Sequence, residues 1–134
     1  MNIEDDGPIA MVDDNPGDVV LARECYSLSS LTNPWISFSH GEALLEHLER
    51  VARGDEPMPA LVLLDINMPR LSGHEVLRRV RARPEFRELP IFCMLTSSSD
   101  PRDKQRGLEL GASGFVVKPH DPTEYIAFFD SLAA

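Results

Sequence analysis

Residues 60–73, with the sequence ALVLLDINMPRLSG, contain the segment that decides the fold of this chain. Five apolar residues, 60–64, run without a break into a single carboxylate, Asp65. A short apolar run that ends in turn residues is typical of a strand buried on both faces of a parallel sheet. Turn-forming residues follow as far as Gly73. We therefore expect Asp65 where a central strand ends, at the edge where open α/β sheets bind ligands.

Other apolar runs of this kind predict further strands, at residues 8–12, 35–39, 90–95 and 115–117. Apolar residues at helical spacing alternate with these runs, and cap pairs such as Asn15-Pro16 mark where helices begin. Short connections and right-handed crossovers then give a parallel α/β sheet with helices on both faces. The sequence thus predicts a single domain over residues 1–134, with a core over about residues 8–133 and an acidic tail over residues 1–7.

The composition limits the classes of function. Thirteen basic residues against twenty-two acidic ones give a formal charge of −9, which argues against non-specific binding to nucleic acid. The N-terminus does not resemble a signal peptide, and no apolar run approaches the ~20 residues of a membrane span, so we expect a soluble, cytoplasmic protein without a membrane partner. Cys25 and Cys93 are expected to be reduced, buried thiols. The four histidines show no relay spacing and are expected at the surface: His40, His47, His74 and His120.

The predicted strand ends deliver a set of reactive side chains to one edge of the sheet. Asp13 and Asp14 follow the first strand, Asp65 the third, Thr96 the fourth and Lys118 the fifth. Carboxylates that share a site repel one another, and an oxygen-only set of ligands suits Mg²⁺. The hydroxyl and the ammonium group suit an anion beside Asp65, and a nucleophilic carboxylate forms an acyl phosphate. This arrangement predicts phosphoryl transfer to Asp65 with Mg²⁺ as cofactor.

These residues also carry a family resemblance over essentially the whole chain. Asp-Asp at 13–14, Asp-x-x-Met-Pro-x-x-x-Gly at 65–73, Thr96 and the Lys-Pro pair at 118–119 resemble the receiver domain of two-component response regulators. The resemblance implies a flavodoxin-like (βα)5 doubly wound sheet of five strands in the order 2-1-3-4-5. It also implies that Asp65 accepts a phosphoryl group from a sensor histidine kinase.

The same resemblance assigns roles to the other site residues. Thr96 would bind a phosphoryl oxygen and Lys118 would pair with the phosphate. The bond before Pro119 would be cis, the isomer that only X-Pro bonds adopt cheaply. The Mg²⁺ ligands would be three side chains and one main-chain carbonyl: Asp13, Asp14, Asp65 and the carbonyl of Asn67.

A narrower resemblance concerns the partner. The segments Asp-Asp-Asn-Pro-Gly-Asp at 13–18 and Leu-Thr-Ser-Ser at 95–98 resemble stand-alone regulators paired with bacterial phytochromes and related hybrid sensor kinases. The chain departs from the usual family pattern at Phe115, where receivers often place a tyrosine as a rotameric switch. A switch here would depend on the packing of Phe115 and on movement of Thr96; alternatively, Phe115 is an ordinary core residue.

Since no effector domain is expected, output is expected through a docking surface. The apolar face of the last helix, with Tyr125, Phe128 and Phe129, is wider than one core face needs and is the candidate interface. A homodimer is the commonest use of such a face. The alternative is that all three aromatic residues belong to the core.

The leading interpretation is a signalling module, not an enzyme in the usual sense, which catalyses only its own phosphorylation and slow dephosphorylation. A Mg²⁺-dependent aspartyl phosphatase is a second class, but its nucleophile typically stands in an Asp-x-Asp motif on the first strand, and a cap domain binds the substrate. A third interpretation is a degenerate receiver that acts as a binding scaffold without phosphorylation.

Overall fold

The central strand predicted from residues 60–73 is present as β3, in the middle of a parallel sheet. The computed structural model describes residue 3 and residues 5–133. The sheet has five strands in the order β2-β1-β3-β4-β5, and each pair is parallel. This order confirms the flavodoxin-like topology. The strands are β1 (Ile9–Val12), β2 (Trp35–Phe38), β3 (Leu61–Asp65), β4 (Phe92–Thr96) and β5 (Gly114–Val117).

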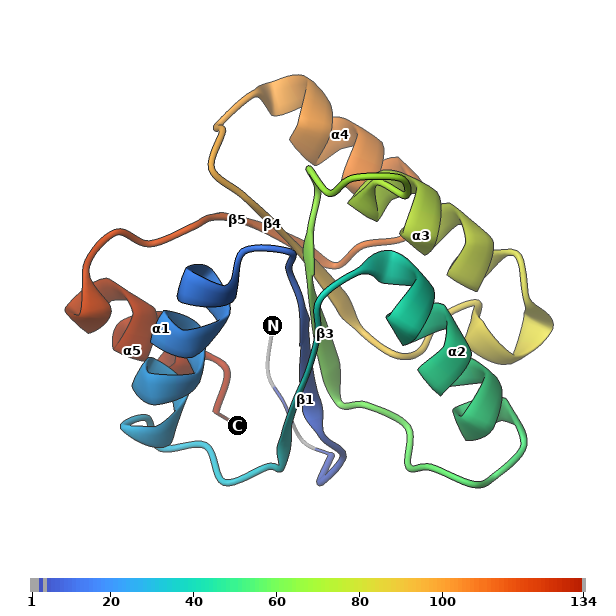
Figure 1. The fold of residues 1–134 in the computed structure, drawn as a ribbon, viewed down its shortest axis with the longest axis horizontal. Helices are drawn as coiled ribbons and strands as arrows, with labels where there is room; N and C mark the ends of the chain where they lie inside the picture. The colour runs from blue at the N-terminus through green and yellow to red at the C-terminus, as the bar shows by residue number, and fades with distance from the viewer. Residues whose placement is uncertain (1–2, 4, 134) are drawn as a thin grey trace.

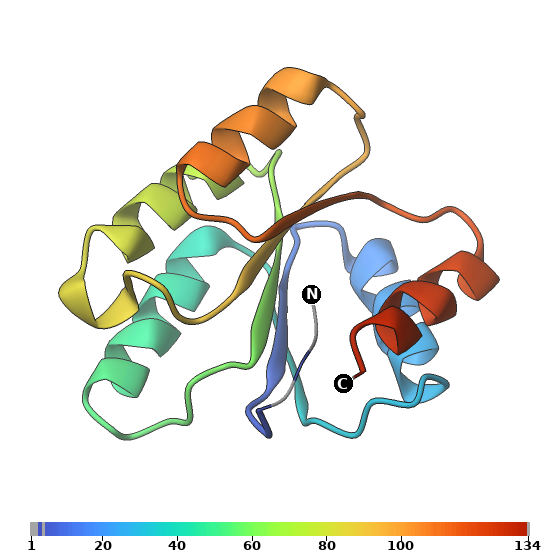
Figure 2. The same ribbon diagram turned by 180° about the vertical axis from the view of Figure 1, so that it is seen from behind.

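Helices cover both faces of the sheet, as the alternation of elements predicts. Helices α1 and α5 lie side by side on one face, and α2, α3 and α4 lie on the other side (Figures 1 and 2). A short 3₁₀ helix, η1 (Pro84–Phe86), follows α3. The helices are α1 (Pro16–Ser27), α2 (Gly41–Ala52), α3 (Gly73–Arg81), α4 (Pro101–Glu109) and α5 (Pro122–Ser131).

Side-chain caps fix where the helices begin. The side chain of Asn15 accepts a hydrogen bond from the backbone N–H of Asp18, and Pro16 occupies the first position of α1. The side chain of Asp121 caps α5 in a similar way, ahead of Pro122. A cap supplies an acceptor for a backbone N–H that has no partner within the helix. The caps therefore set the lengths of the loops that carry the strand-end residues.

Alternate residues of β3 belong to two separate cores. Val62 and Leu64 pack toward α2 and α3, whereas Leu61 and Leu63 pack toward α1 and α5. All four side chains are fully buried, as expected for a strand covered on both faces. Asp65 is the last residue of this strand, so the two cores hold its backbone on both sides.

The prediction that the aromatic residues of α5 form an interface is wrong for Tyr125 and Phe129. Tyr125 is 2% exposed and Phe129 is fully buried, whereas Phe128 is only partly buried. The ring of Phe129 lies 5.2 Å from that of Tyr26 and 6.0 Å from that of Trp35. The physical reason is that α5 packs against both α1 and the sheet, so a wide apolar stripe is needed for the core.

The expectation of surface histidines is wrong for His47. Its side chain lies on α2, is 7% exposed, and its ring centroid is 5.2 Å from that of Phe38. Burial lowers the pKa of the imidazole below its ordinary value. His47 directly precedes Leu48 in the sequence, and both side chains lie on the buried side of α2.

Burial of His47 predicts an acid-dependent loss of stability. A pKa lowered in the folded state means that the contribution to stability is present above pH 6.5 and is lost as the pH falls below that value. Between pH 7.5 and 5.5 the free energy of unfolding should fall less in His47→Phe than in the wild type. The difference between the two proteins should be at most about 1.4 kcal/mol per pH unit. Urea unfolding of both proteins at each pH measures the difference. Equal pH dependence of the two proteins would contradict the prediction.

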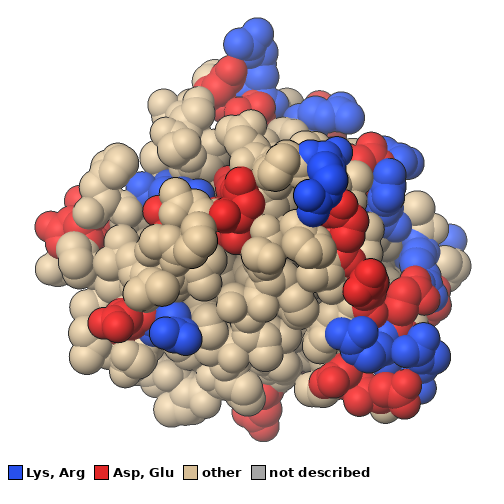
Figure 3. Space-filling model, viewed as in Figure 1, with Lys and Arg blue, Asp and Glu red and all other residues tan. Residues whose placement is uncertain are grey.

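The surface charges are mixed on the side formed by α2, α3 and α4. Figure 3 shows basic and acidic side chains interspersed there. Several form ion pairs: Glu75 with Arg78 and Arg79, Glu42 with Arg70, and Glu49 with Arg83. In the part of the chain that the structure describes, no helix has both the length and the apolarity to cross a bilayer.

Candidate functional site

Three carboxylates meet at the carboxyl edge of the sheet, as the strand ends predict. Asp13 follows β1 directly, Asp14 is its neighbour, and Asp65 ends β3. One oxygen from each residue lies within 4.8 Å of those of the other two. Asp13 is 1% and Asp65 5% exposed, whereas Asp14 faces solvent. A set of hard oxygen donors of this kind fits Mg²⁺.

Backbone amides orient the two buried carboxylates. The N–H of Asn15 donates to Asp13 Oδ1 over 2.9 Å, and the N–H of Asn67 donates to Asp65 Oδ1 over 3.3 Å. In each case the donor comes from the loop that follows the strand, two residues after the carboxylate. The loops therefore hold one oxygen of each carboxylate and leave the other available to cations.

The carboxylate of Asp65 is in an electrostatically unfavourable position. Burial, and after it the negative charge of Asp13, raise the pKa of Asp65 to about 7. The charge of Lys118 and the amide of Asn67 oppose this rise. A cation at the cluster would favour the ionised form of Asp65.

Lys118 comes from the end of β5 and reaches the acidic cluster. Its Nζ atom lies 2.8 Å from Asp13 Oδ2 and 3.6 Å from Asp65 Oδ2. Burial alone would lower the pKa of the ammonium group, but its hydrogen bonds to carboxylates raise the pKa above its ordinary value. The prediction of a cis bond before Pro119 is wrong. Among the described residues the cis peptide bond is that between Leu89 and Pro90. Trans is the lower-energy isomer of most X-Pro bonds, and Lys118 reaches the cluster with it.

Thr96 lies at the same edge, at the end of β4. The strand register pairs Asp65 with Leu95, so Thr96 lies one residue beyond the level of Asp65 on the neighbouring strand. Its side chain is fully buried, and its Oγ1 accepts a hydrogen bond from the N–H of Ser98 over 3.0 Å. The Thr96 hydroxyl therefore keeps its own proton as a donor. Its carbonyl accepts a 2.7 Å hydrogen bond from the N–H of Lys118, which links the two residues through the backbone.

The expected roles of two other site residues, Asn67 and Phe115, stay predictions. Asn67 is exposed, and the contact that the structure describes is through its N–H, so the role of its carbonyl as a metal ligand stays a prediction. Phe115 pairs with Met94 in the sheet register and is partly buried against the core beneath α2 and α3. This position fits core packing, and a role of Phe115 as a switch stays a prediction.

Gly73 approaches the backbone of Asp65 closely. A Cβ atom at this position would lie 2.3 Å from the carbonyl oxygen of Asp65. The N–H of Gly73 also donates to the carbonyl of Ile66 over 2.9 Å. The glycine of the 65–73 motif is thus explained by this contact, because any larger residue would displace the end of β3.

Sequence reasoning missed Asp18 as a residue of the site. In the sequence it is an acidic residue in the first turn of a helix, which the helix dipole alone explains. In the structure its Oδ2 lies 2.9 Å from Lys118 Nζ. The two residues are 100 positions apart, so their contact depends on the tertiary fold. No local pattern in the sequence indicates this contact.

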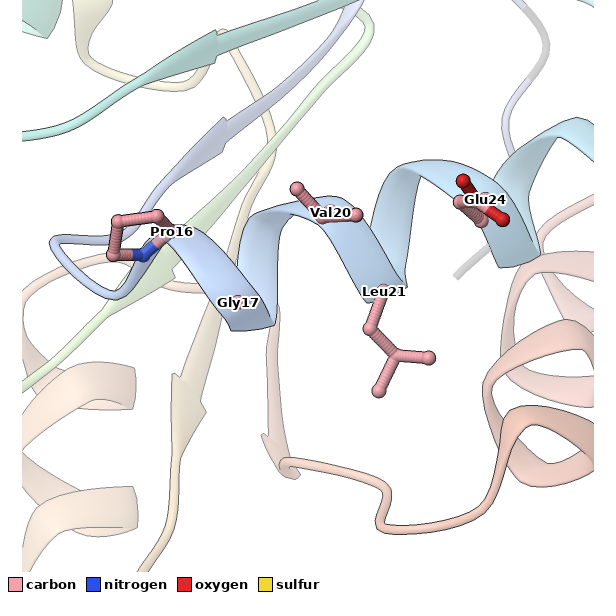
Figure 4. Close-up of a pocket in the computed structure, with 5 residues that line it drawn as sticks. All are labelled: Pro16, Gly17, Val20, Leu21 and Glu24. Atoms are coloured by element: carbon pink, nitrogen blue, oxygen red, sulfur yellow. The ribbon is translucent and has the colours of Figure 1, made fainter.

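Two surface hollows lie near α1. One adjoins the acidic cluster and is lined by Asp13, Asp14 and residues of α1 and β2. The other lies along α1 (Figure 4) and is lined by Pro16, Gly17, Val20, Leu21 and Glu24. The first hollow therefore gives a ligand of the cluster access from solvent.

Comparison with known proteins identifies the family. The model of the response regulator receiver domain matches residues 9–130. The chain belongs to the response regulator receiver family. This match runs from the first residue of β1 to the penultimate residue of α5 and includes every residue of the site described above. Receiver domains are signalling modules, in agreement with the interpretation from the sequence.

Individual relatives point to the same family. The response regulator Rcp1 of Synechocystis sp. is 29% identical over 111 residues, which are 82% of this receiver and 75% of Rcp1. The structure of RPA3017, a response regulator in red light signaling of R. palustris, has a TM-score of 0.83 and 29% identity, and covers 94% of this chain and 90% of that one. The bacteriophytochrome response regulator RtBRR has a TM-score of 0.78 and 33% identity, over 96% and 78% of the two chains. Several other curated relatives are longer, and the chain spans 13–38% of them.

Proposed function

We propose that this receiver accepts a phosphoryl group from a sensor histidine kinase on the carboxylate of Asp65. The observation that carries the proposal is the meeting of a buried acceptor, two further carboxylates and Lys118 at one edge of the sheet. Each of these charges would be unfavourable there alone, and together they suit the transfer of an anionic group with a cation.

The side chains have separate tasks in the transfer. An oxygen of Asp65 attacks the phosphorus atom, the bond from phosphorus to the donor breaks, and the donor leaves with the electron pair of that bond. Lys118 pairs with the negative charge on the phosphoryl oxygens, and the Thr96 hydroxyl donates a hydrogen bond to one of them. Both groups are held before the reaction, by ion pairs and by the Ser98 amide respectively. Little reorganisation is then needed when charge moves.

The metal that suits this site is Mg²⁺, held by Asp13, Asp14 and Asp65, with the carbonyl of Asn67 as a further ligand. The bound ion would neutralise charge on the transferring phosphoryl group. Two of the carboxylates are already oriented by backbone amides, so the chain supplies the ligands with little rearrangement.

The names of the relatives support a particular kind of kinase partner. RtBRR is named as a bacteriophytochrome response regulator, and RPA3017 is described in red light signaling. We extend this to the present chain and propose a sensor histidine kinase of the bacteriophytochrome type as donor. A cytoplasmic location and output through docking of a partner are part of the same proposal, although Tyr125 and Phe129 are buried and cannot form the docking surface.

Intact mass measurement tests the proposal. Wild type, Asp65→Asn and Asp55→Asn are incubated with Mg²⁺ and acetyl phosphate. We expect wild type to gain one phosphoryl mass, and this gain to be lost on chelation of Mg²⁺. Asp65→Asn should gain nothing, since an amide is not a nucleophile of this kind. The amide also removes a buried charge, so this variant should remain folded.

Asp55→Asn is the matched control. Asp55 is an exposed aspartate that pairs with Arg53 in the loop after α2, and the chemical change is identical. It should be phosphorylated like wild type. If folded wild type gains no mass at any time, the proposal fails and a phosphorylation-independent scaffold takes its place.

A further inference from the structure

Asp18 is a carboxylate of the site that the proposed transfer does not use. It is the third residue of α1, and its Oδ2 lies 2.9 Å from Lys118 Nζ. The cluster of carboxylate oxygens that could hold a metal consists, among the described residues, of Asp13, Asp14 and Asp65. Asp18 therefore contacts the site through the lysine, and not through the acceptor.

The ammonium group of Lys118 lies closer to Asp13 and Asp18 than to Asp65. Lys118 Nζ is 2.8 Å from Asp13 and 2.9 Å from Asp18, but 3.6 Å from Asp65. Two carboxylates thus hold the ammonium nearer to β1 and α1 than to the acceptor. A metal ion bound by Asp13, or a phosphoryl group on Asp65, would each change the partners of Lys118. Asp18 is the partner that neither event removes.

We propose that Asp18 is a positioning residue that acts on phosphoryl transfer through Lys118. It keeps the ammonium paired when Asp13 binds a metal ion. It also competes with the phosphoryl oxygens for the same ammonium after transfer. This inference rests on the proposed function, because it concerns the partners of the lysine during that reaction.

The two roles predict effects of opposite sign for Asp18→Asn. Without this carboxylate, Lys118 pairs more strongly with Asp13, and the dissociation constant of Mg²⁺ should rise about threefold to tenfold. At saturating Mg²⁺ the lysine has lost a competing partner, so beryllofluoride, a mimic of the phosphoryl group, should bind about threefold to tenfold more tightly. General loosening of α1 would weaken the binding of both.

A double-mutant cycle tests whether Asp18 acts through the lysine. Calorimetry measures the dissociation constants of Mg²⁺ and of beryllofluoride for wild type, Asp18→Asn, Lys118→Met and the double variant. In the Lys118→Met background, Asp18→Asn should change each constant by less than about twofold, since the residue that couples it to the site is gone.

The chain has two lysines, Lys104 and Lys118, which allows a direct check of the contact. With lysine labelled by ¹³C at Cε, NMR gives one reporter and one internal reference. Asp18→Asn should shift the Lys118 signal and leave that of Lys104, on α4, unchanged. An unchanged Lys118 signal would mean that the ion pair is absent in solution, and the inference would be wrong.

Glu124→Gln is the matched control for the helix dipole. Glu124 is the third residue of α5 and follows a cap and a proline, as Asp18 does in α1. It should leave both constants unchanged. If wild type binds both ligands but Asp18→Asn changes neither, or weakens both, the inference is wrong and the proposed function stands. If wild type binds neither ligand, the proposed function itself fails and the inference with it.

Discussion

Replacement of Lys118 by methionine is expected to slow phosphorylation of Asp65 by about 100-fold to 1,000-fold, the usual cost of losing one group that stabilises developing charge. The ammonium lies 3.6 Å from Asp65 Oδ2 before the reaction, so little movement is needed for it to pair with a transferred phosphoryl group. Methionine keeps most of the apolar length of the side chain and removes the charge. The measurement is the initial rate of mass gain with acetyl phosphate at saturating Mg²⁺.

The same variant should bind Mg²⁺ more tightly than wild type. Lys118 and the metal ion would compete for the carboxylate of Asp13, and removal of the lysine leaves this carboxylate free for the metal. Lys104→Met is the control, because it removes the other lysine from an exposed position on α4. A Lys118→Met variant that is phosphorylated as fast as Lys104→Met would show that the lysine has no role in transfer.

Truncation of Phe129 to alanine is expected to lower the free energy of unfolding by about 3–5 kcal/mol. The side chain is fully buried and its ring contacts those of Tyr26, Trp35 and Tyr125. Since domains are stable by about 5–15 kcal/mol, this loss would remove a large part of the total. Chemical denaturation of wild type and variant measures it.

Phe128→Ala is the control for this prediction. Phe128 is the preceding residue of α5 but is only partly buried, so its truncation should cost clearly less. The oligomeric state of Phe129→Ala, measured by light scattering, should equal that of wild type. A stable Phe129→Ala variant with altered assembly would instead support the interface that the sequence predicts.

The parts of the fold set by local rules could be predicted from the sequence. Asn15 and Pro16 predict the start of α1, and the apolar run before Asp65 predicts a buried strand. Parallel strands then bring their carboxyl ends together, so the sequence alone was enough to assign Asp13, Asp65 and Lys118 to one site. Each of these steps uses either a local pattern or a general property of parallel sheets.

The features that were missed depend on how helices pack. An apolar stripe on α5 looks the same whether it faces a partner or both α1 and the sheet, so the sequence could not place Phe129. The burial of His47 depends on the packing of α2 over Phe38. The contact between Asp18 and Lys118 joins residues from opposite ends of the chain. No local pattern contains this information.

The close approach of Gly73 to Asp65 has a consequence for the length of the loop between them. The loop leaves the end of β3 and returns until the Gly73 N–H donates to Ile66 and the Gly73 Cα lies against the Asp65 carbonyl. The two ends of the loop are therefore in contact, and this contact fixes the number of residues between them. Insertion or deletion of a single residue between positions 66 and 72 would break this closure and shift Asp65. The loop should therefore tolerate substitutions of its side chains better than any change in its length.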